Sequence, residues 1–152
     1  MPLRVAVQMD PLEAINIAGD STFAIMLKAQ QVGHALYHYA AENLSYSEGR
    51  LWTMARPVTV QSVAGDHYRF GEPEILDLGR DVDVVLMRQD PPFDLGYITA
   101  THLLERIGGE TLVVNDPASV RDAPEKLWVL DFAQFMPPTL ITRSLGLTRK
   151  FL

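Results

Sequence analysis

Three apolar runs in this chain end in the same way, with Asp-Pro following shortly after each. They are residues 4–7, followed by Met9-Asp10-Pro11, residues 82–86, followed by Asp90-Pro91, and residues 111–114, followed by Asn115-Asp116-Pro117. Short β-like runs that alternate with helical patterns predict an α/β fold with parallel strands. Because parallel strands end at one edge of a sheet, where open α/β sheets bind ligands, we expect these polar residues to gather on one rim.

Each Asp-Pro pair also has an ordinary explanation, because Asp side chains and proline both stabilise turns. The segment Met87–Asp94 favours a site, since it places a cation, an amide, two carboxylates and two prolines after an apolar run. Arg88 could form a structural ion pair with Asp90 or Asp10. It could equally grip a substrate carboxylate with its planar guanidinium.

The pattern along the chain also predicts the order of the elements. Asp20 or Ser21 is expected to cap a helix that ends at Gly33, and residues 35–39 then form a second strand. The other expected elements are an antiparallel hairpin within 44–70 with a break at 47–49, a loop at 71–80, a helix from Tyr97 to Ile107, a helix near 124–132 and a short β-like stretch at 139–142.

We expect one main domain over residues 1–143 and the start of a linker at 144–152. A chain of 152 residues with 47% hydrophobic and 21% charged side chains has the composition of an ordinary globular domain. The last stretch carries four large apolar residues with no further chain to pack on, so we interpret it as a linker or the first helix of a following domain.

Charge and composition exclude several classes of protein. A net charge of −6 gives no basic surface of the kind that nucleic-acid-binding proteins use. The chain has no cysteine, which excludes a disulfide framework and fits a reducing compartment. No signal-like stretch and no apolar run of about 18 residues occurs, so we expect a cytoplasmic protein without a membrane anchor.

Common catalytic and phosphate-binding motifs are missing. Neither a Gly-x-Gly-x-x-Gly turn nor a P-loop occurs, which argues against a dehydrogenase, a P-loop enzyme or a generic nucleotide-binding protein. His34 and His38 are four residues apart, but the Gly33 break places them at a strand start, where this spacing does not favour zinc. Ser21 has no Gly-x-Ser-x-Gly elbow, which argues against a serine hydrolase.

Five blocks of the sequence together carry a family resemblance. They are Met9-Asp10-Pro11, Asp20-Ser21-Thr22-Phe23-Ala24, Met87-Arg88-Gln89-Asp90-Pro91-Pro92-Phe93-Asp94, Asn115-Asp116-Pro117 and Glu125-Lys126-Leu127. From about Arg4 to Arg143 the chain resembles the N-terminal part of bacterial (prokaryotic-type) glutathione synthetases. The resemblance implies a Rossmann-like pre-ATP-grasp domain, with a mainly parallel sheet flanked by helices and a β-hairpin insertion.

Members of that family join γ-glutamylcysteine to glycine with ATP and magnesium, through an acyl phosphate. The resemblance implies substrate-binding roles for Asp10, Ser21, Arg88, Asp90 and Asn115. In this set Arg88 suits a carboxylate, and Asp10 or Asp90 suits an ammonium group. The resemblance also implies that Lys126 contacts an ATP phosphate, and it places no catalytic residue and no metal ligand in this chain.

The family continues with an ATP-grasp domain that holds a glycine-rich loop and the magnesium-binding carboxylates, and neither occurs in this sequence. We therefore expect no synthetase activity and no tight binding of ATP or Mg²⁺ from this chain by itself. A non-catalytic ligand-binding or assembly module with the same fold is the alternative. For the full-length family the resemblance implies a homo-oligomer.

Overall fold

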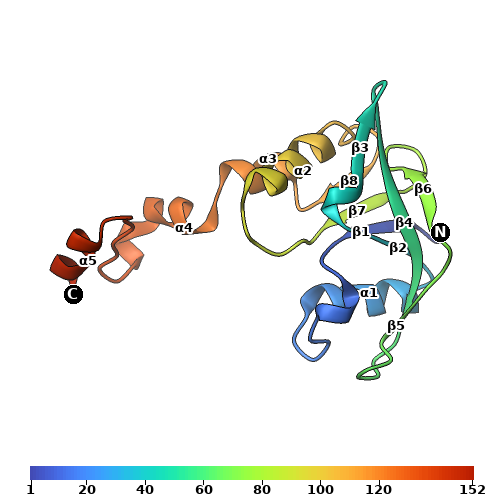
Figure 1. Cartoon of the computed structure of the whole chain (residues 1–152), viewed down its shortest axis with the longest axis horizontal. Helices are drawn as coiled ribbons and strands as arrows, with labels where there is room; N and C mark the ends of the chain where they lie inside the picture. Colours follow the sequence, from blue (N-terminus) through green and yellow to red (C-terminus); the bar gives the residue numbers. More distant parts are fainter. The chain divides into compact units, whose positions relative to one another are not determined.

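The computed structural model describes residues 1–124 and 126–152 with their side chains, in two units, Met1–Asp122 and Ala123–Leu152. The first unit contains a curled eight-stranded sheet with helices on both faces (Figure 1). The strands are β1 (Arg4–Gln8), β2 (Ala35–Tyr39), β3 (Leu44–Ser47), β4 (Arg50–Val60), β5 (Tyr68–Phe70), β6 (Glu74–Asp77), β7 (Val84–Met87) and β8 (Leu112–Val114). The helices are α1 (Ser21–Gln31), α2 (Leu95–Glu105) and α3 (Pro117–Asp122), with short 3-10 helices η1 (Leu12–Ala14) and η2 (Ala41–Asn43).

The sheet has a parallel half and an antiparallel half. Its order is β3-β4-β2-β1-β7-β8, and β5 and β6 both pair with β4. Each neighbouring pair within the series β2-β1-β7-β8 is parallel, whereas β4 is antiparallel to all four of its partners, β2 included. The α/β class is therefore confirmed, but the expectation of a mainly parallel sheet is imprecise. The long β4 is the organising strand of the antiparallel half.

Alternating side chains of the strands build one core on each face of the sheet. Val5 and Val7 of β1 pack with Phe23 and Met26 of α1. Ala6, between those valines, belongs to the other core, which includes Leu104 of α2. This alternation is the period-2 pattern of a strand buried on both faces. Helix α1 therefore covers one face, and α2 covers the other.

Local signals in the sequence set the ends of several elements. Asp20 caps α1, because its Oδ1 accepts a hydrogen bond from Phe23 N at 2.6 Å. Gly33 follows the helix with a φ of 92°, a conformation that glycine adopts without a Cβ clash. The break at 47–49 is confirmed as the β3–β4 turn, where Glu48 and Gly49 both have positive φ.

Three predictions about elements were wrong in detail, and one helix was missed. The expected loop at 71–80 contains β6, whose Ile75 and Leu76 pair with β4. The expected strand at 139–142 does not form, and no described strand pairs with these residues. Helix α3 was not predicted. The helix expected near 124–132 is split into α4 (Glu125–Trp128) and the 3-10 helix η3 (Val129–Phe135).

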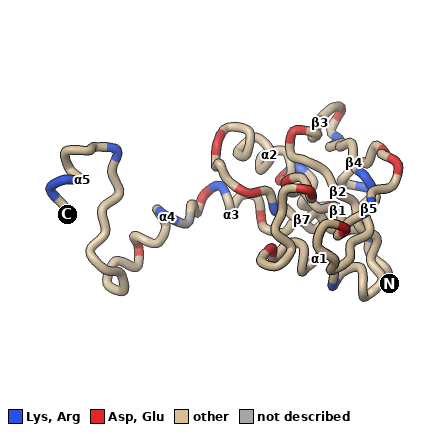
Figure 2. Tube along the Cα trace, turned by 60° about the horizontal axis from the view of Figure 1, so that its bottom comes forward, with Lys and Arg blue, Asp and Glu red and all other residues tan. Residues whose placement is uncertain are grey.

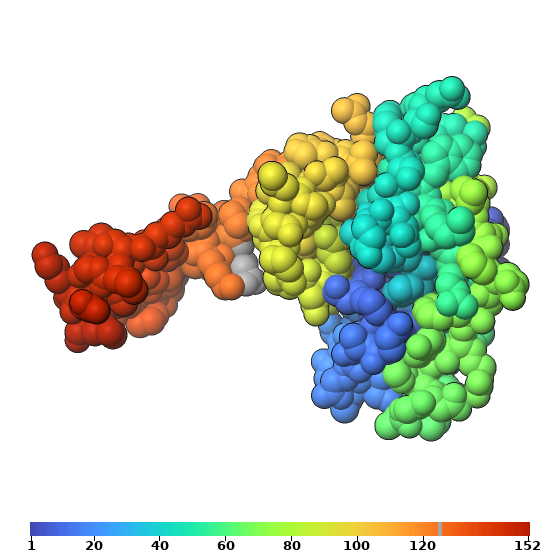
Figure 3. Space-filling view, viewed as in Figure 1, coloured from blue at the N-terminus to red at the C-terminus, as the bar shows by residue number. Residues whose placement is uncertain are grey.

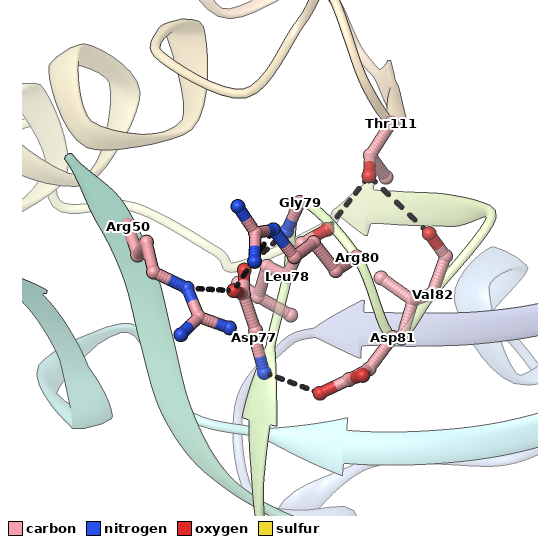
Figure 4. A network of polar contacts seen from close by, with 8 residues as sticks. All are labelled: Arg50, Asp77, Leu78, Gly79, Arg80, Asp81, Val82 and Thr111. Atoms are coloured by element: carbon pink, nitrogen blue, oxygen red, sulfur yellow. Dashed lines mark hydrogen bonds and ion pairs between the residues drawn. The ribbon is translucent and has the colours of Figure 1, made fainter.

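A buried carboxylate joins β4 to the segment after β6 (Figure 4). Asp77 is 2% exposed and accepts a bond from Arg50 Nε at 2.5 Å and from Gly79 N at 3.0 Å. Arg80 Nε lies 4.0 Å from the same carboxylate. Close by, Thr111 Oγ1 donates to the carbonyl oxygen of Leu78 at 2.7 Å. These contacts hold the entry to β7 and β8 in place.

The second unit, Ala123–Leu152, consists of α4, η3 and α5 (Leu145–Phe151). None of its described residues is buried, and large apolar side chains such as Phe135 and Leu145 are exposed at 82% and 76%. The expected boundary between residues 143 and 144 stays a prediction, because these units do not show where a further domain would begin. In the part of the chain that the structure describes, no helix is long and apolar enough to cross a membrane.

Candidate functional site

The ends of β1 and β7 bring two of the predicted residues together. The strands are parallel neighbours, with Gln8 opposite Met87, so the residues that follow them meet at one rim. Asp10 Oδ2 accepts a hydrogen bond from Asp90 N at 2.7 Å. The convergence predicted from the Asp-Pro exits is therefore confirmed for Asp10 and Asp90.

Arg88 lies beside this rim and contacts the start of α1. Its Nε donates to Thr22 Oγ1 at 2.9 Å, and its Nη2 donates to Ser21 Oγ at 2.8 Å. The structure shows no ion pair from Arg88 to either rim aspartate among the described residues, so the purely structural ion pair is not what it forms. A guanidinium has five N–H donors, and these two bonds leave three of them for another acceptor.

A cavity of about 480 Å³ opens next to Asp10 and Asp90. Figure 3 shows the segments that surround it, near residue 40 and near residues 90–103, side by side on the surface of the first unit. Its lining residues are Met9, Asp10, Pro11, Ala40, Ala41, Glu42, Leu44, Gln89, Asp90, Pro92, Asp94, Gly96, Tyr97, Thr99, Ala100 and Leu103. This volume is within the usual range for small-molecule sites, about 300–1,000 Å³.

The lining of the cavity is apolar with an acidic edge. Four carboxylates, those of Asp10, Glu42, Asp90 and Asp94, line it, and no lysine or arginine is among the lining residues. Figure 2 shows acidic positions in the loops near β7 and α2. Such an edge attracts cationic groups and disfavours anions.

The pKa of Tyr97, which lines this cavity, is affected by charged residues nearby. Burial raises the pKa of its phenol above the ordinary value of 10.0, the positive charge of Arg88 lowers it, and the carboxylate of Asp90 raises it. Asp94 Oδ1 caps α2 by accepting from Tyr97 N at 3.0 Å. The guanidinium of Arg88 therefore acts on the cavity electrostatically, although Arg88 is not among the lining residues.

His38 supports the loop that carries Asp10. Its Nε2 lies 3.2 Å from the carbonyl oxygen of Asp10, and this nitrogen must donate because a carbonyl only accepts. Burial lowers the pKa of His38 below the ordinary 6.5, an effect that the hydrogen bond to Asp10 partly opposes. Burial thus disfavours the protonated form of His38.

The remaining predicted residue of the first unit, Asn115, makes no described contact with Asp10 or Asp90. Asn115 follows β8, is exposed and does not line the cavity. Its neighbour Asp116 instead caps α3, since its Oδ1 accepts from Ser119 N at 2.7 Å. Hydrogen bonding by the side chain of Ser119, and then by its backbone, lowers the pKa of Asp116. Lys126 is exposed in α4 of the second unit. The roles expected for Asn115 and Lys126 stay predictions.

A magnesium ion bound with ATP needs several oxygen ligands. The described residues contain no group of three or more His, Asp or Glu side chains that could hold a metal ion. His34 does not join His38 in a site, because its Nδ1 accepts from Leu3 N at 3.2 Å. The side chains that the structure describes thus do not fit a complete magnesium site.

Sequence reasoning missed some cavity residues. Glu42 and Leu44 enter from the segment between β2 and β4, which carried no polar motif at a strand end. Gln8 is fully buried and donates from Nε2 to Gln89 Oε1, yet sequence reasoning assigned it no role. A lone amide between the apolar run at 4–7 and Met9 was the signal that could have identified it.

Comparisons with known proteins show what this chain is similar to. The family model described as the prokaryotic glutathione synthetase N-terminal domain matches residues 3–121. The chain is 57% identical over 144 residues to a glutathione synthetase of Rhodopseudomonas palustris, a match that covers 95% of this chain and 46% of that protein. It is 59% identical over 145 residues to one of Bradyrhizobium diazoefficiens, with coverages of 95% and 46%. It is 39% identical over 150 residues to one of Salmonella typhimurium, with coverages of 98% and 47%. The chain thus spans about half the length of the curated relatives it matches.

Proposed function

Because the chain belongs to the prokaryotic glutathione synthetase N-terminal domain family, we propose that it supplies the γ-glutamylcysteine-binding part of a glutathione synthetase. The observation that carries the proposal is the hydrogen bond from Asp90 N to the Asp10 carboxylate beside the cavity, with the positive charge of Arg88 acting on Tyr97 in the cavity lining. The side chains of Asp10, Asp90 and Arg88 offer complementary charges to a substrate that has an ammonium group and carboxylates.

The charges suggest how the substrate is oriented. The carboxylates of Asp10 and Asp90 take the α-ammonium group, because the acidic edge favours a cation. Arg88 takes a carboxylate with the N–H groups that Ser21 and Thr22 leave unused. Holding both ends of the substrate positions its reacting carboxylate for a partner site, which is how a binding domain contributes to rate.

The chemistry of the whole reaction needs groups from outside this chain. In the proposed ATP-grasp ligase, ATP activates the cysteinyl carboxylate as an acyl phosphate, and the glycine amine then displaces phosphate. Lys126 is proposed to contact a phosphate of ATP. The described residues lack a magnesium site, so the ligands of the metal are proposed to come from outside them. The absence of cysteine supports a cytoplasmic, reducing location.

A titration tests the binding role directly. γ-Glutamylcysteine is added to the purified chain in a calorimeter, and the α-linked Glu-Cys isomer serves as the control ligand. We expect saturable heat with the γ-linked compound and at least tenfold weaker binding of the isomer, whose ammonium group and amide are spaced differently. Equal heats from both isomers, or none from either, would contradict the proposed binding role.

A chimera tests the link to synthesis. The chain replaces the matched N-terminal part of the Rhodopseudomonas palustris synthetase, and ADP formation dependent on γ-glutamylcysteine and glycine is measured. We expect activity from the chimera and none from the chain by itself. A chimera that folds and binds γ-glutamylcysteine without forming ADP would favour the non-catalytic module, and ADP formation by the chain alone would refute its proposed dependence on a second domain.

A further inference from the structure

A buried amide lies directly behind the proposed substrate cavity. Gln8 is 0% exposed at the end of β1, and its Nε2 donates to Gln89 Oε1. Gln89 follows β7 and lines the cavity. Two amides that are far apart in sequence thus form a hydrogen-bonded pair, in which Gln8 lies in the core and Gln89 lies at the cavity wall.

The hydrogen bond between Gln8 and Gln89 determines which atom of the Gln89 amide can bind a ligand. Since Gln89 Oε1 accepts from Gln8, the group left over is Gln89 Nε2, which has two N–H donors. No described residue accepts a hydrogen bond from that nitrogen. Gln89 therefore offers a donor to whatever enters the cavity.

The position of Gln8 is costly for the fold. Its Oε1 is buried and has no hydrogen-bond partner among the described residues, and the same holds for the hydroxyl of Tyr39, the residue opposite it on β2. An apolar side chain of similar size would avoid burying an unpaired carbonyl oxygen. Since the buried amide of Gln8 costs stability, its presence is better explained by its hydrogen bond to Gln89, which orients the Gln89 amide.

The acidic edge of the cavity limits which kind of group can accept a hydrogen bond from Gln89. A carboxylate placed at Gln89 would be repelled by those of Asp10, Asp90 and their neighbours, whereas a neutral carbonyl would not. γ-Glutamylcysteine has a neutral carbonyl in its γ-amide. We propose that Gln89 binds this amide carbonyl and that Gln8 is a positioning residue that holds Gln89 in the donating orientation. This inference rests on the proposed function.

The test combines affinity with stability in the intact chain. Gln89→Met removes the proposed hydrogen-bond donor. Gln8→Met keeps that donor but removes the hydrogen bond that orients it, and Gln31→Met makes the same change at an exposed site on α1. Affinity for γ-glutamylcysteine is measured by calorimetry, and stability by thermal unfolding. Methionine is chosen because it is similar to glutamine in length and flexible enough to fill the same space.

We expect Gln89→Met to weaken binding about tenfold and Gln8→Met about three- to tenfold, the range for one hydrogen bond. Gln8→Met should leave the unfolding midpoint unchanged or higher, because it also removes the unpaired oxygen. A loss of affinity without a loss of stability separates positioning from a structural role. Gln31→Met should change neither quantity.

A second readout follows the amide itself. In the ¹⁵N-labelled chain, the side-chain NH₂ signals of Gln89 should shift on addition of γ-glutamylcysteine, and those of Gln31 should not. If the intact chain binds but Gln89→Met and Gln8→Met bind equally well, the inference is wrong while the proposed function stands. If the intact chain does not bind at all, the proposed function fails, and this inference fails with it.

Discussion

The carboxylate of Asp10 and the backbone N–H of Asp90 are joined by a 2.7 Å hydrogen bond across the ends of β1 and β7. The two residues are 80 positions apart in the sequence. The bond fixes the start of the Asp90–Asp94 segment against the loop after β1. One of the two rim carboxylates therefore has a structural task as well as the proposed binding task.

Two substitutions of Asp10 separate these tasks. Asp10→Asn keeps an oxygen that can accept from Asp90 N, so the free energy of unfolding in urea should stay close to that of the intact protein. Asp10→Ala removes the acceptor and should lower it by about 1 kcal/mol. Both changes should weaken γ-glutamylcysteine binding, because both remove the negative charge. Unchanged affinity of Asp10→Asn would show that this carboxylate does not hold the ammonium group.

Arg88 depends on the shape of its guanidinium as well as its charge. Lysine keeps the charge but has a single nitrogen, which cannot reach Ser21 and Thr22 in the geometry of Nη2 and Nε. Arg88→Lys should therefore lower the free energy of unfolding by about 1–2 kcal/mol and weaken γ-glutamylcysteine binding about tenfold or more.

The control for Arg88 is Arg69→Lys, since Arg69 forms an exposed ion pair with Asp66. Exposed ion pairs contribute little to stability, so the free energy of unfolding of this variant should fall by less than about 1 kcal/mol. Its affinity for γ-glutamylcysteine should be unchanged. Urea denaturation and calorimetric titration measure both quantities. A lysine variant of Arg88 that binds as well as the intact chain would mean that charge alone suffices.

Two arginines that face the same carboxylate should differ strongly in their contribution to stability. Arg50 Nε lies 2.5 Å from Asp77 Oδ2 and its guanidinium stacks on Trp52 at 4.1 Å, whereas Arg80 Nε is 4.0 Å away and mostly exposed. Arg50→Ala should lower the free energy of unfolding by about 1.5–3 kcal/mol, because it leaves the buried Asp77 with a weaker partner. Arg80→Ala should lower it by less than about 1 kcal/mol. Equal losses would show that Asp77 is held by charge and not by the short hydrogen bond.

Local chemistry allowed much of the first unit to be predicted from the sequence. Asp20 and Gly33 mark the ends of α1 because a helix cap and a positive φ are properties of single residues. Asp10 and Asp90 could be placed on one rim because parallel strands end at the same edge. These inferences needed no knowledge of which strands are neighbours.

The parts that could not be predicted depend on contacts between distant residues. Strand β6 is short, and its residues acquire their backbone partners only from β4, so nothing local distinguished it from a loop. The Gln8–Gln89 contact joins residues 81 positions apart. The far wall of the cavity, at Glu42 and Leu44, likewise depends on where η2 and β3 lie in space.

His38 should make the stability of the protein depend on pH. Burial lowers the pKa of His38 in the folded state below the ordinary 6.5, so just below pH 6.5 the unfolded chain binds a proton that the folded chain does not. The contribution of His38 is therefore fully present above pH 6.5 and is lost as the pH falls from 6.5 through the lower folded pKa. The free energy of unfolding should rise with pH in this window, by at most about 1.4 kcal/mol per pH unit from this one group.

Urea unfolding at several pH values between 5.5 and 7.5 measures this slope. His38→Phe keeps an aromatic ring against Phe70, whose centroid is 5.4 Å from that of His38, and should remove most of the slope attributable to this residue. It also loses the bond to the Asp10 carbonyl, so its stability above pH 7 should fall by about 1 kcal/mol. His102→Phe, at an exposed position on α2, is the matched control. A His38→Phe variant with the same pH slope as the intact chain would show that another group causes the dependence, because the phenylalanine side chain cannot take up a proton.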